Sequence, residues 1–396
     1  MKQCLQNSMK YALPSIVLSQ FLCTSLWFVG NSIAEDIALE LQASSSFLTH
    51  QTSSIQLGFI LGTFFFALFT ISDRYSPSKV FLTSALVAGV FNLGISLPGI
   101  NTNMVLVLRL FTGFFLAGIY PVGMKIASDY YQGGLGKSLG LLVGALVLGT
   151  ALPHLLKELT LDFSWRYVIY TTTLFSLVGG LVISLVPDGP HRRASEKINL
   201  AGFLFAFRQK AFRNAAFGYF GHMWELYTFW AFVPVMIMAY NTQFEDAQLS
   251  VPLFSFLIIG AGGIACALSG FIAAYLGIKQ VAIGALLLSC LCCLVSPIFL
   301  FSSSVIVFIG FLFFWSLVVI ADSPMFSTLV ANYAPEQSRG TALTIVTCIG
   351  FAITIVSIQV VSNLSRTIDA RIVYMFLAIG PFLGLWALVS RAHKSS

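Results

Sequence analysis

The chain has 396 residues, of which 57% are hydrophobic and 9% are charged, and its formal net charge is +6. Soluble domains carry about 25% charged residues, so this composition excludes a soluble globular protein. The apolar runs are continuous and of helical length, which excludes an outer-membrane barrel with its ~10-residue alternating strands. The sequence therefore predicts an all-α polytopic membrane protein.

Several other functions are excluded by missing motifs. The chain has no Gly-x-x-x-x-Gly-Lys-Ser/Thr loop, no His-Glu-x-x-His pair, and no basic and aromatic run of the kind that binds nucleic acid. The seven cysteines lie mostly inside apolar runs without metal-site spacing. We therefore expect no enzymatic activity, no metal or cofactor, and no nucleic-acid partner.

The apolar runs predict twelve transmembrane helices in two pseudo-symmetric six-helix bundles, 1–187 and 212–396, joined by a cytoplasmic linker at 188–211. The apolar and basic residues from Leu200 to Lys210 favour an interfacial helix in this linker, and a solvated connection is the plainer alternative. The expected spans are residues 11–32, 52–72, 79–98, 103–126, 136–156, 165–187, 212–240, 250–276, 279–299, 304–330, 339–363 and 370–390.

Basic residues set the orientation of these spans. With both termini in the cytoplasm, fifteen Lys and Arg lie in inner segments and four in outer segments, which is a clear positive-inside asymmetry. We expect a monomeric, multi-pass protein of the bacterial inner membrane, with the lipid bilayer as its surroundings and both termini cytoplasmic.

The fourth span carries three charges that helix geometry separates. Arg109 and Tyr120 fall on one face, whereas Lys125 points away from them, and Asp129 follows Lys125 by one turn. An ionised side chain in hydrocarbon costs at least about 2.5–3.5 kcal/mol, so Arg109 is expected to face a solute cavity with Tyr120. Alternatively, Arg109 pairs with an acid such as Glu225 or snorkels outward.

The first span carries a polar stripe. Gln20, Thr24, Trp27 and Asn31 follow one another at spacings of four, three and four, which places them on one face of a continuous helix. We expect this face to line the substrate cavity, and isolated interhelical hydrogen bonds are the alternative.

Spans seven and ten hold the remaining buried acids. Glu225 lies near the middle of span seven, and His222 one turn away is expected to share its proton. Asp322 is expected to be a second proton site. It shares a face with Trp315, which is expected at the substrate, and Pro324 is expected to bend the helix. The alternatives are a neutral, permanently hydrogen-bonded Glu225 and an Asp322 that only fixes the bend. Tyr120 and Asp322 are expected to meet across the central cavity.

The two halves look like internal repeats. FTISDRYSPSKV aligns with GFIAAYLGIKQV at an offset of 201 residues. Trp27 overlies Trp224, which is therefore expected at the substrate site, and Pro121 overlies Pro324. Duplicated bundles with the solute bound between them are common among secondary transporters.

The loop after span two contains Asp73, Arg74 and Lys79, and the matching loop of the second half contains Gly270, Gly277 and Lys279. These residues resemble the G-x-L-A-D-R-x-G-R-R loop of the major facilitator superfamily. Span four resembles the R-x-x-x-G pattern of that family. The resemblance implies alternating access by two rocking bundles. We expect a role in gating for Asp73, Arg74, Lys125, Asp129 and Pro324.

Within that family the sequence favours some functions over others. The absence of arginine from spans two and eight argues against nitrate transport, and Gly140, Gly144 and Gly149 in span five favour close helix packing over an antiporter signature. Because a guanidinium forms bidentate pairs with carboxylates, Arg109 favours proton-coupled uptake of a small organic anion. The alternatives are proton-coupled efflux of an amphipathic compound or drug, and a receptor or sensor that keeps the fold without transporting.

Overall fold

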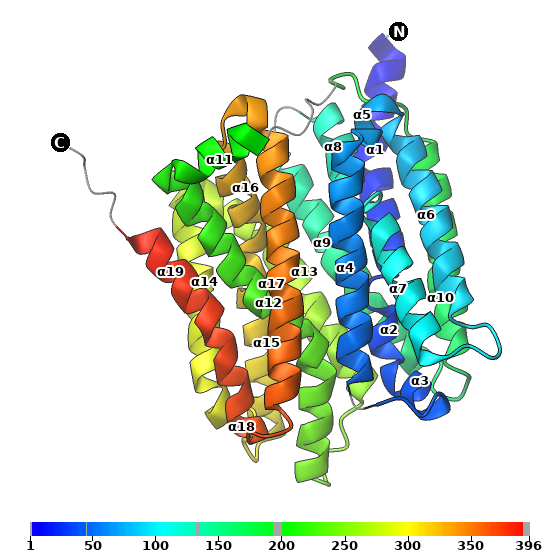
Figure 1. The fold of residues 1–396 in the computed structure, drawn as a ribbon, viewed down its shortest axis with the longest axis vertical. Helices are drawn as coiled ribbons and strands as arrows, with labels where there is room; N and C mark the ends of the chain where they lie inside the picture. The colour runs from blue at the N-terminus through cyan, green and yellow to red at the C-terminus, as the bar shows by residue number, and fades with distance from the viewer. Residues whose placement is uncertain (1, 45, 132–134, 193–199, 391–396) are drawn as a thin grey trace.

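The computed structural model describes the chain except for residues 1, 45, 132–134, 193–199 and 391–396. All regular elements in the described part are helices. In Figure 1 the helices of the first half, blue through cyan to the first greens, pack on one side, and those of the second half, green through yellow to red, on the other. The first half contains α1 (Lys2–Thr24), α2 (Val29–Ser32), α3 (Ala34–Glu40), α4 (Phe47–Leu68), α5 (Ile71–Arg74), α6 (Pro77–Gly94), α7 (Thr102–Leu116), α8 (Tyr120–Tyr130), α9 (Leu135–Leu159) and α10 (Arg166–Ser184).

The connection between the halves contains the helix α11 (Leu200–Arg208), at the place where the sequence favours one. Phe203 is buried against the bundle, whereas the apolar side chains of Leu204 and Phe205 are exposed, so α11 turns apolar side chains both towards the bundle and outwards. The second half then contains α12 (Lys210–Gln243), α13 (Val251–Leu276), α14 (Ile278–Phe299), α15 (Val305–Ala321), α16 (Ser323–Tyr333), the 3₁₀ turn η1 (Glu336–Ser338), α17 (Arg339–Leu364), α18 (Ala370–Val373), the 3₁₀ turn η2 (Tyr374–Ala378) and α19 (Ile379–Val389).

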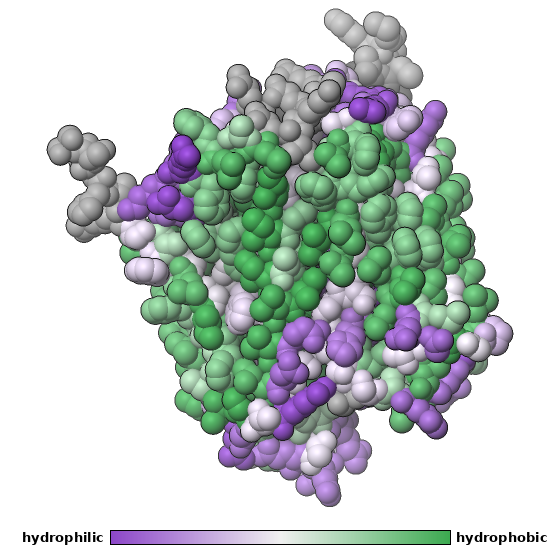
Figure 2. Space-filling view, in the orientation of Figure 1, coloured by the Kyte–Doolittle hydropathy of each residue, from purple (hydrophilic) through white to green (hydrophobic). Residues whose placement is uncertain are grey.

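The bundle has two ends. We call the end at which α1 begins and α19 finishes, beside α5 and α11, the terminal face, and the end near α3 and α18 the opposite face (Figure 1). In the described residues nine helical segments are long and apolar enough to cross a membrane, and α1, α6 and α12 complete the passages. Figure 2 shows hydrophobic residues covering the middle of the molecule and hydrophilic residues at its ends. The predicted all-α, twelve-span architecture is confirmed.

Spans four and ten are broken at matching points of the repeat. In span four, α7 ends at Leu116 and α8 begins at Tyr120; in span ten, α15 ends at Ala321 and α16 begins just beyond it. Pro121 and Pro324 each occupy the first turn of the second helix. A proline there lacks only an N–H that has no intrahelical partner, but its ring clashes with the preceding turn. The bend predicted at Pro324 is therefore present, and it has a counterpart at Pro121.

The halves meet where α9 packs along α13 and α4 packs along α17. A Cβ added to Gly144 would lie 3.1 Å from the carbonyl oxygen of Gly263, and one added to Gly149 would lie 2.4 Å from that of Phe21. Only a hydrogen fits comfortably at such close backbone approaches. The close-packing interpretation therefore holds for Gly144 and Gly149, whereas a Cβ on Gly140 would lie at an ordinary contact distance of 3.7 Å from the carbonyl oxygen of Cys266.

Candidate functional site

Span one is broken, contrary to the prediction of a continuous helix. α1 ends at Thr24 and α2 begins at Val29, although neither glycine nor proline lies between them. The backbone N–H groups of Leu26 and Trp27 bond three residues back, to Cys23 and Thr24. The carbonyls of Leu26 and Trp27 are then left without a backbone donor among the described residues.

Arg109, on α7, supplies the missing donors. Its side chain is fully buried, Nη1 donates to the carbonyl oxygen of Leu26 at 2.9 Å, and Nη2 donates to that of Trp27. Gln51, on α4, donates through Nε2 to the carbonyl of Gly30 at 2.8 Å. Unpaired carbonyls at membrane depth cost several kcal/mol, so these side chains stabilise the break. In this conformation Arg109 contacts the backbone of span one.

The break also separates the four polar residues that were predicted to lie on one face of span one. Thr24 bonds within its own helix, to the carbonyl of Gln20 at 2.8 Å. Asn31 donates to Thr52 Oγ1, on α4, at 3.0 Å, which is the interhelical alternative. The Gln20 amide is buried and has no hydrogen-bond partner in the described part of the protein. The four residues therefore do not form one continuous polar face, because the turn after Thr24 changes the helical register.

Arg109 has no carboxylate partner among the residues that the structure describes. Its expected alternative partner, Glu225, is occupied by other donors. The guanidinium is therefore a buried cation held by carbonyl dipoles alone, with Nε unpaired. An arrangement of this kind favours an anion nearby, since Coulomb attraction is strong where water is excluded.

Glu225, on α12, is fully buried and accepts three hydrogen bonds. Trp315 Nε1, on α15, donates to Oε1 at 2.7 Å, and Ser289 Oγ, on α14, donates to Oε2 at 2.9 Å. Cys293 Sγ donates to Oε1 at 3.2 Å. The three donors stabilise a carboxylate, whereas burial away from water opposes a charge there, so the two effects act in opposite directions.

His222 contacts Asp322 and not Glu225, which corrects the predicted proton sharing. Its Nδ1 lies 2.7 Å from Asp322 Oδ1, and both side chains are essentially unexposed. Asp322 lies at the break between α15 and α16, so it leaves the face of Trp315 and reaches a different turn of α12. The second half therefore holds two separate acid sites one turn apart along α12.

Tyr120 and Asp322 do not meet as expected in the described residues. Tyr120 is partly buried at the start of α8 and packs on the main hydrophobic core. No hydrogen bond or ring contact joins it to Asp322 there. The two residues occupy nearly matching positions in the two repeats, at the breaks of spans four and ten. Their side chains nevertheless contact different neighbours.

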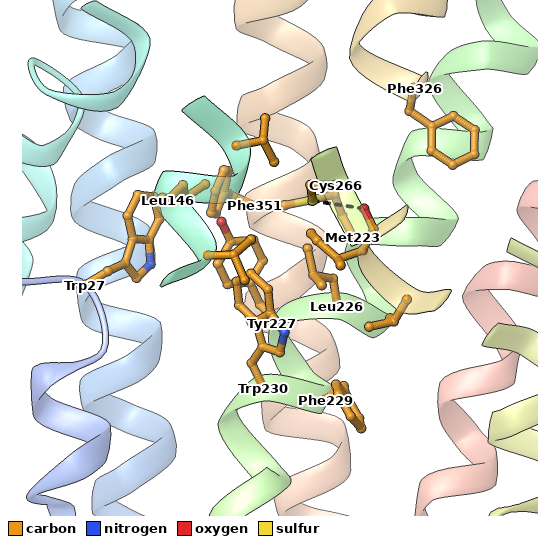
Figure 3. Packing of buried hydrophobic residues seen from close by; sticks show 14 of the residues in the cluster. Trp27, Leu146, Met223, Leu226, Tyr227, Phe229, Trp230, Cys266, Phe326 and Phe351 are labelled. Carbon is orange, nitrogen blue, oxygen red and sulfur yellow. Dashed lines mark hydrogen bonds between the residues drawn. The ribbon is translucent and has the colours of Figure 1, made fainter. Parts of the chain in front are cut away.

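An aromatic cluster packs across the interface between the halves (Figure 3). Trp27 lies 5.9 Å from Tyr227 and 5.6 Å from Phe351 between ring centroids, and Phe59 lies 4.7 Å from both Trp27 and Phe351. Sequence reasoning selected Trp27 alone from this cluster. A signal was available, because Tyr227 and Trp230, three residues apart on α12, share a face and lie 5.2 Å from each other.

Trp224, the repeat partner of Trp27, lies elsewhere. Its Nε1 donates to the carbonyl of Phe376 in η2 at 3.2 Å, and its carbonyl accepts from Ser357 Oγ on α17. The side chain therefore bonds to η2, and the backbone of Trp224 bonds to α17, so both contacts lie within the second half. The matching positions in the sequence do not produce matching contacts.

Hydrogen bonds join the halves near the opposite face. Gln359, on α17, donates to Ser53 Oγ, on α4, at 2.8 Å, and Thr49 Oγ1 lies 3.3 Å from Ser362 Oγ. Nearby, Ser250 donates to the carboxylate of Glu158, which joins α13 to α9. Together with the aromatic cluster, these contacts hold the two halves against each other.

Three of the predicted gating charges, Asp73, Lys125 and Asp129, come together at the terminal face. Lys125 Nζ lies 2.8 Å from Asp73 Oδ1 and 4.0 Å from Asp129 Oδ1, so its shorter contact is with the loop after span two, a contact that the helix spacing did not predict. Arg192 also donates to the carbonyl of Asp73 at 3.0 Å. Arg74 is directed away from this cluster and donates to Thr70 Oγ1.

Comparison with known proteins agrees with this architecture. The sequence profile of the Major Facilitator Superfamily matches residues 16–358. Among solved structures, the human organic anion transporter MFSD10 (TETRAN) superposes with a TM-score of 0.74 at 15% identity, covering 96% of this chain and 99% of that one. Comparison with curated proteins gives no match. The profile match, together with the repeated six-span halves, places this chain in the Major Facilitator Superfamily of secondary transporters.

Proposed function

We propose that this transporter couples movement of a small organic anion to protons, with the terminal face in the cytoplasm. The observation that carries the proposal is the division of buried charge. Arg109, in the first half, has no ion-pair partner among the described residues, and the second half has two buried acid sites. The orientation rests on the fifteen to four distribution of Lys and Arg.

The acid sites are suited to binding protons. An ionised carboxylate in hydrocarbon costs at least about 2.5–3.5 kcal/mol, and the three donors to Glu225 offset part of that cost. His222 Nδ1 lies 2.7 Å from Asp322 Oδ1, so the two side chains are close enough to share a proton. The two carboxyl groups, Glu225 and Asp322, are therefore the groups that we propose take up and release protons.

Arg109 supports an organic anion as the solute. Its planar fork matches a carboxylate, and it is held by two carbonyls that a carboxylate would replace. Trp27 belongs to both sites, because its carbonyl accepts from Arg109 and its ring is part of the aromatic cluster at the interface of the halves. The printed name of the human structure also concerns organic anions, but at 15% identity that likeness supports the fold alone.

The aromatic cluster favours a second candidate, efflux of an amphipathic compound. Trp27, Phe59, Tyr227 and Phe351 offer ring faces at the point where the halves meet. Aromatic surfaces bind flat apolar groups well. This candidate differs from the first in the charge of its solute.

Binding and transport measurements separate these candidates. We would screen the purified protein by thermal shift against monocarboxylates, dicarboxylates and cationic amphiphiles, since selective binding raises apparent stability. The hits would then be tested in proteoliposomes for counterflow and for accumulation under an imposed proton gradient. Binding of cations but no carboxylates would overturn the organic-anion proposal, and binding without counterflow would indicate a receptor.

Cysteine labelling tests the orientation. We expect labels applied outside intact cells to reach cysteines introduced into 35–44 and not those introduced into 188–192. The reverse pattern would place the terminal face outside.

A further inference from the structure

Gln56, on α4, is a buried polar side chain that the proposed function does not yet use. It is fully buried, and both polar atoms of its amide, Nε2 and Oε1, have no hydrogen-bond partner in the described part of the chain. An unpaired amide away from water destabilises a fold, so buried amides are nearly always paired. The partner of this amide is therefore expected from outside the chain, as water or as part of a solute.

The packing of α4 on α7 places Gln56 close to the level of Arg109. The two helices run from the opposite face to the terminal face with their backbones in contact, since a Cβ on Gly58 would lie 1.8 Å from the carbonyl oxygen of Leu110. Gln56 precedes Gly58 by two residues, and Arg109 precedes Leu110 by one. The amide and the guanidinium therefore lie within about one helical turn of each other along this pair of helices.

The neighbours of Gln56 on α4 show the direction of its side chain. Thr52, one turn earlier, accepts from Asn31, and Phe59, one turn later, lies 4.7 Å from Trp27 between ring centroids. At 100° per residue, Gln56 lies within about 60° of both Thr52 and Phe59 around the helix. It therefore faces the broken span one, between Asn31 and the aromatic cluster.

The aromatic cluster itself contains unpaired donors. The rings of Trp27 and Trp230 are fully buried, and neither Nε1 has a hydrogen-bond partner among the residues described. Both rings contact Tyr227, at 5.9 Å and 5.2 Å between centroids. In Figure 3 Trp27 comes from the first half, whereas Tyr227 and Trp230 come from α12 of the second. The interface therefore combines ring faces with N–H groups that a solute can satisfy when the halves separate.

Trp27 connects these features to the proposed anion site. Its carbonyl accepts from Arg109 Nη2, and its ring belongs to the cluster. A carboxylate that replaces this carbonyl at Arg109 therefore carries its organic group to the ring faces of the cluster. Aromatic rings pair with one another more favourably than their buried area alone accounts for.

We propose that the solute is an aromatic carboxylate and that Gln56 helps to determine this specificity. The inference rests on the proposed organic-anion function and names its substrate class. Arg109 and Nε2 of Gln56 bind the carboxylate, and the aromatic ring of the solute lies among Trp27, Tyr227 and Phe351. Because these three rings come from both halves, the movement that separates the halves also opens the site for the ring.

The first test needs no variant. Benzoate and cyclohexanecarboxylate carry the same charged group on a six-membered ring, and only benzoate is aromatic. We expect isothermal titration of the purified protein in detergent to show about 2- to 10-fold tighter binding of benzoate, the difference that an aromatic contact supplies. Equal or weaker binding of benzoate would overturn this inference alone. A failure of every carboxylate to bind would overturn the organic-anion proposal with it.

Gln56→Leu provides the second test. Leucine replaces an unpaired amide with methyl groups of similar size, so the melting temperature should not fall. The affinity for benzoate should fall at least about tenfold, because its carboxylate loses a donor. Gln280→Leu, at an exposed position on α14, is the matched control and should bind benzoate like the parent.

Two outcomes of this substitution would overturn the role of Gln56. Parent-like affinity for benzoate in Gln56→Leu would show that the amide does not contact the solute. A lower melting temperature together with weaker binding would show that the amide stabilises the fold instead.

Discussion

The guanidinium of Arg109 bridges two consecutive carbonyls of span one, with Nη1 2.9 Å from the oxygen of Leu26 and Nη2 donating to Trp27. Discontinuous helices in transporters often use free carbonyls to coordinate a cation. Here a side chain of the protein is that cation. A solute carboxylate can engage the fork only by replacing one or both carbonyls, so solute binding and the shape of span one are linked.

Replacing Arg109 with Lys tests this bridge. An ammonium group has no planar fork, so we expect one buried carbonyl to lose its partner, at a cost of about 1–3 kcal/mol. Thermal unfolding in detergent measures this loss. We also expect weaker binding of any carboxylate found in the screen.

Arg74→Lys is the matched control, because Arg74 is an exposed arginine that donates to Thr70 Oγ1. It should melt like the parent, since exposed contacts of this kind contribute little. Parent-like stability of Arg109→Lys would contradict a bridging role, and parent-like carboxylate binding would exclude a bidentate one.

A glycine in α7 gives a second prediction about span four. A Cβ on Gly113 would lie 1.9 Å from the carbonyl oxygen of Ile55, a backbone atom of α4. Gly113→Ala must therefore push the two helices apart, and we expect a loss of about 1–3 kcal/mol or more in thermal unfolding.

Gly284 is the control, because a Cβ there would meet nothing within 4 Å. Gly284→Ala should be neutral or stabilising by up to about 1 kcal/mol, through helix propensity. Equal effects of the two substitutions would mean that α4 and α7 do not approach as closely as described.

The partner of His222 can be identified by double-mutant cycles. Because Nδ1 lies 2.7 Å from Asp322, we expect His222→Gln and Asp322→Asn to be non-additive by about 0.5–3 kcal/mol in unfolding free energy. The cycle of His222→Gln with Glu225→Gln should be closer to additive. A larger coupling in the second cycle would restore the pairing predicted from the spacing along α12.

Stability at low pH depends on an ion pair at the opposite face. Hydrogen bonds from Arg166 and Trp165 lower the pKa of Glu40. A lowered folded-state pKa gives stability that is present above the unfolded value of about 4.3 and is lost as pH falls through the folded value. The melting temperature should therefore fall less between pH 6 and pH 3 in Glu40→Gln than in the parent.

The effect will be small because Glu40 is partly exposed and solvent screens the pair. Glu35→Gln, on the exposed side of the same helix, serves as the control and should follow the parent. If both variants shift the pH profile equally, general charge and not the pair with Arg166 is responsible.

The spans and their grouping into halves were predictable because an apolar run of about 20 residues is a local signal. The bends at Pro121 and Pro324 were also predictable, since proline acts on its own helix. The break after Thr24 was not, because no local residue causes it. Its carbonyls are satisfied by Arg109, 83 residues from Leu26 in sequence.

The acid sites show the same limit. Helix spacing correctly placed His222 one turn from Glu225, but both side chains bond to other spans, His222 to Asp322 and Glu225 to Trp315. Proximity along one helix does not decide a partner when several helices surround it. The Lys125 contact with Asp73 was missed for the same reason.

The last prediction is that Glu225 carries the coupling proton. Glu225→Gln keeps the size of the side chain. It also keeps an oxygen that can accept from Trp315 Nε1, which lies 2.7 Å from Oε1 in the parent, and from Cys293. Ser289 can rotate its hydroxyl to accept from the new amide. The protein should therefore fold, but the site can no longer gain or lose a proton.

We expect Glu225→Gln to abolish accumulation driven by a proton gradient in proteoliposomes while counterflow of the same solute persists, because exchange needs no net proton movement. Glu245→Gln, at an exposed position beyond α12, should behave like the parent in both assays. Loss of counterflow as well would assign Glu225 to structure or to solute binding. Unchanged accumulation would place the proton path elsewhere, and Asp322, held by His222 at the break of span ten, would then be the next acid to replace.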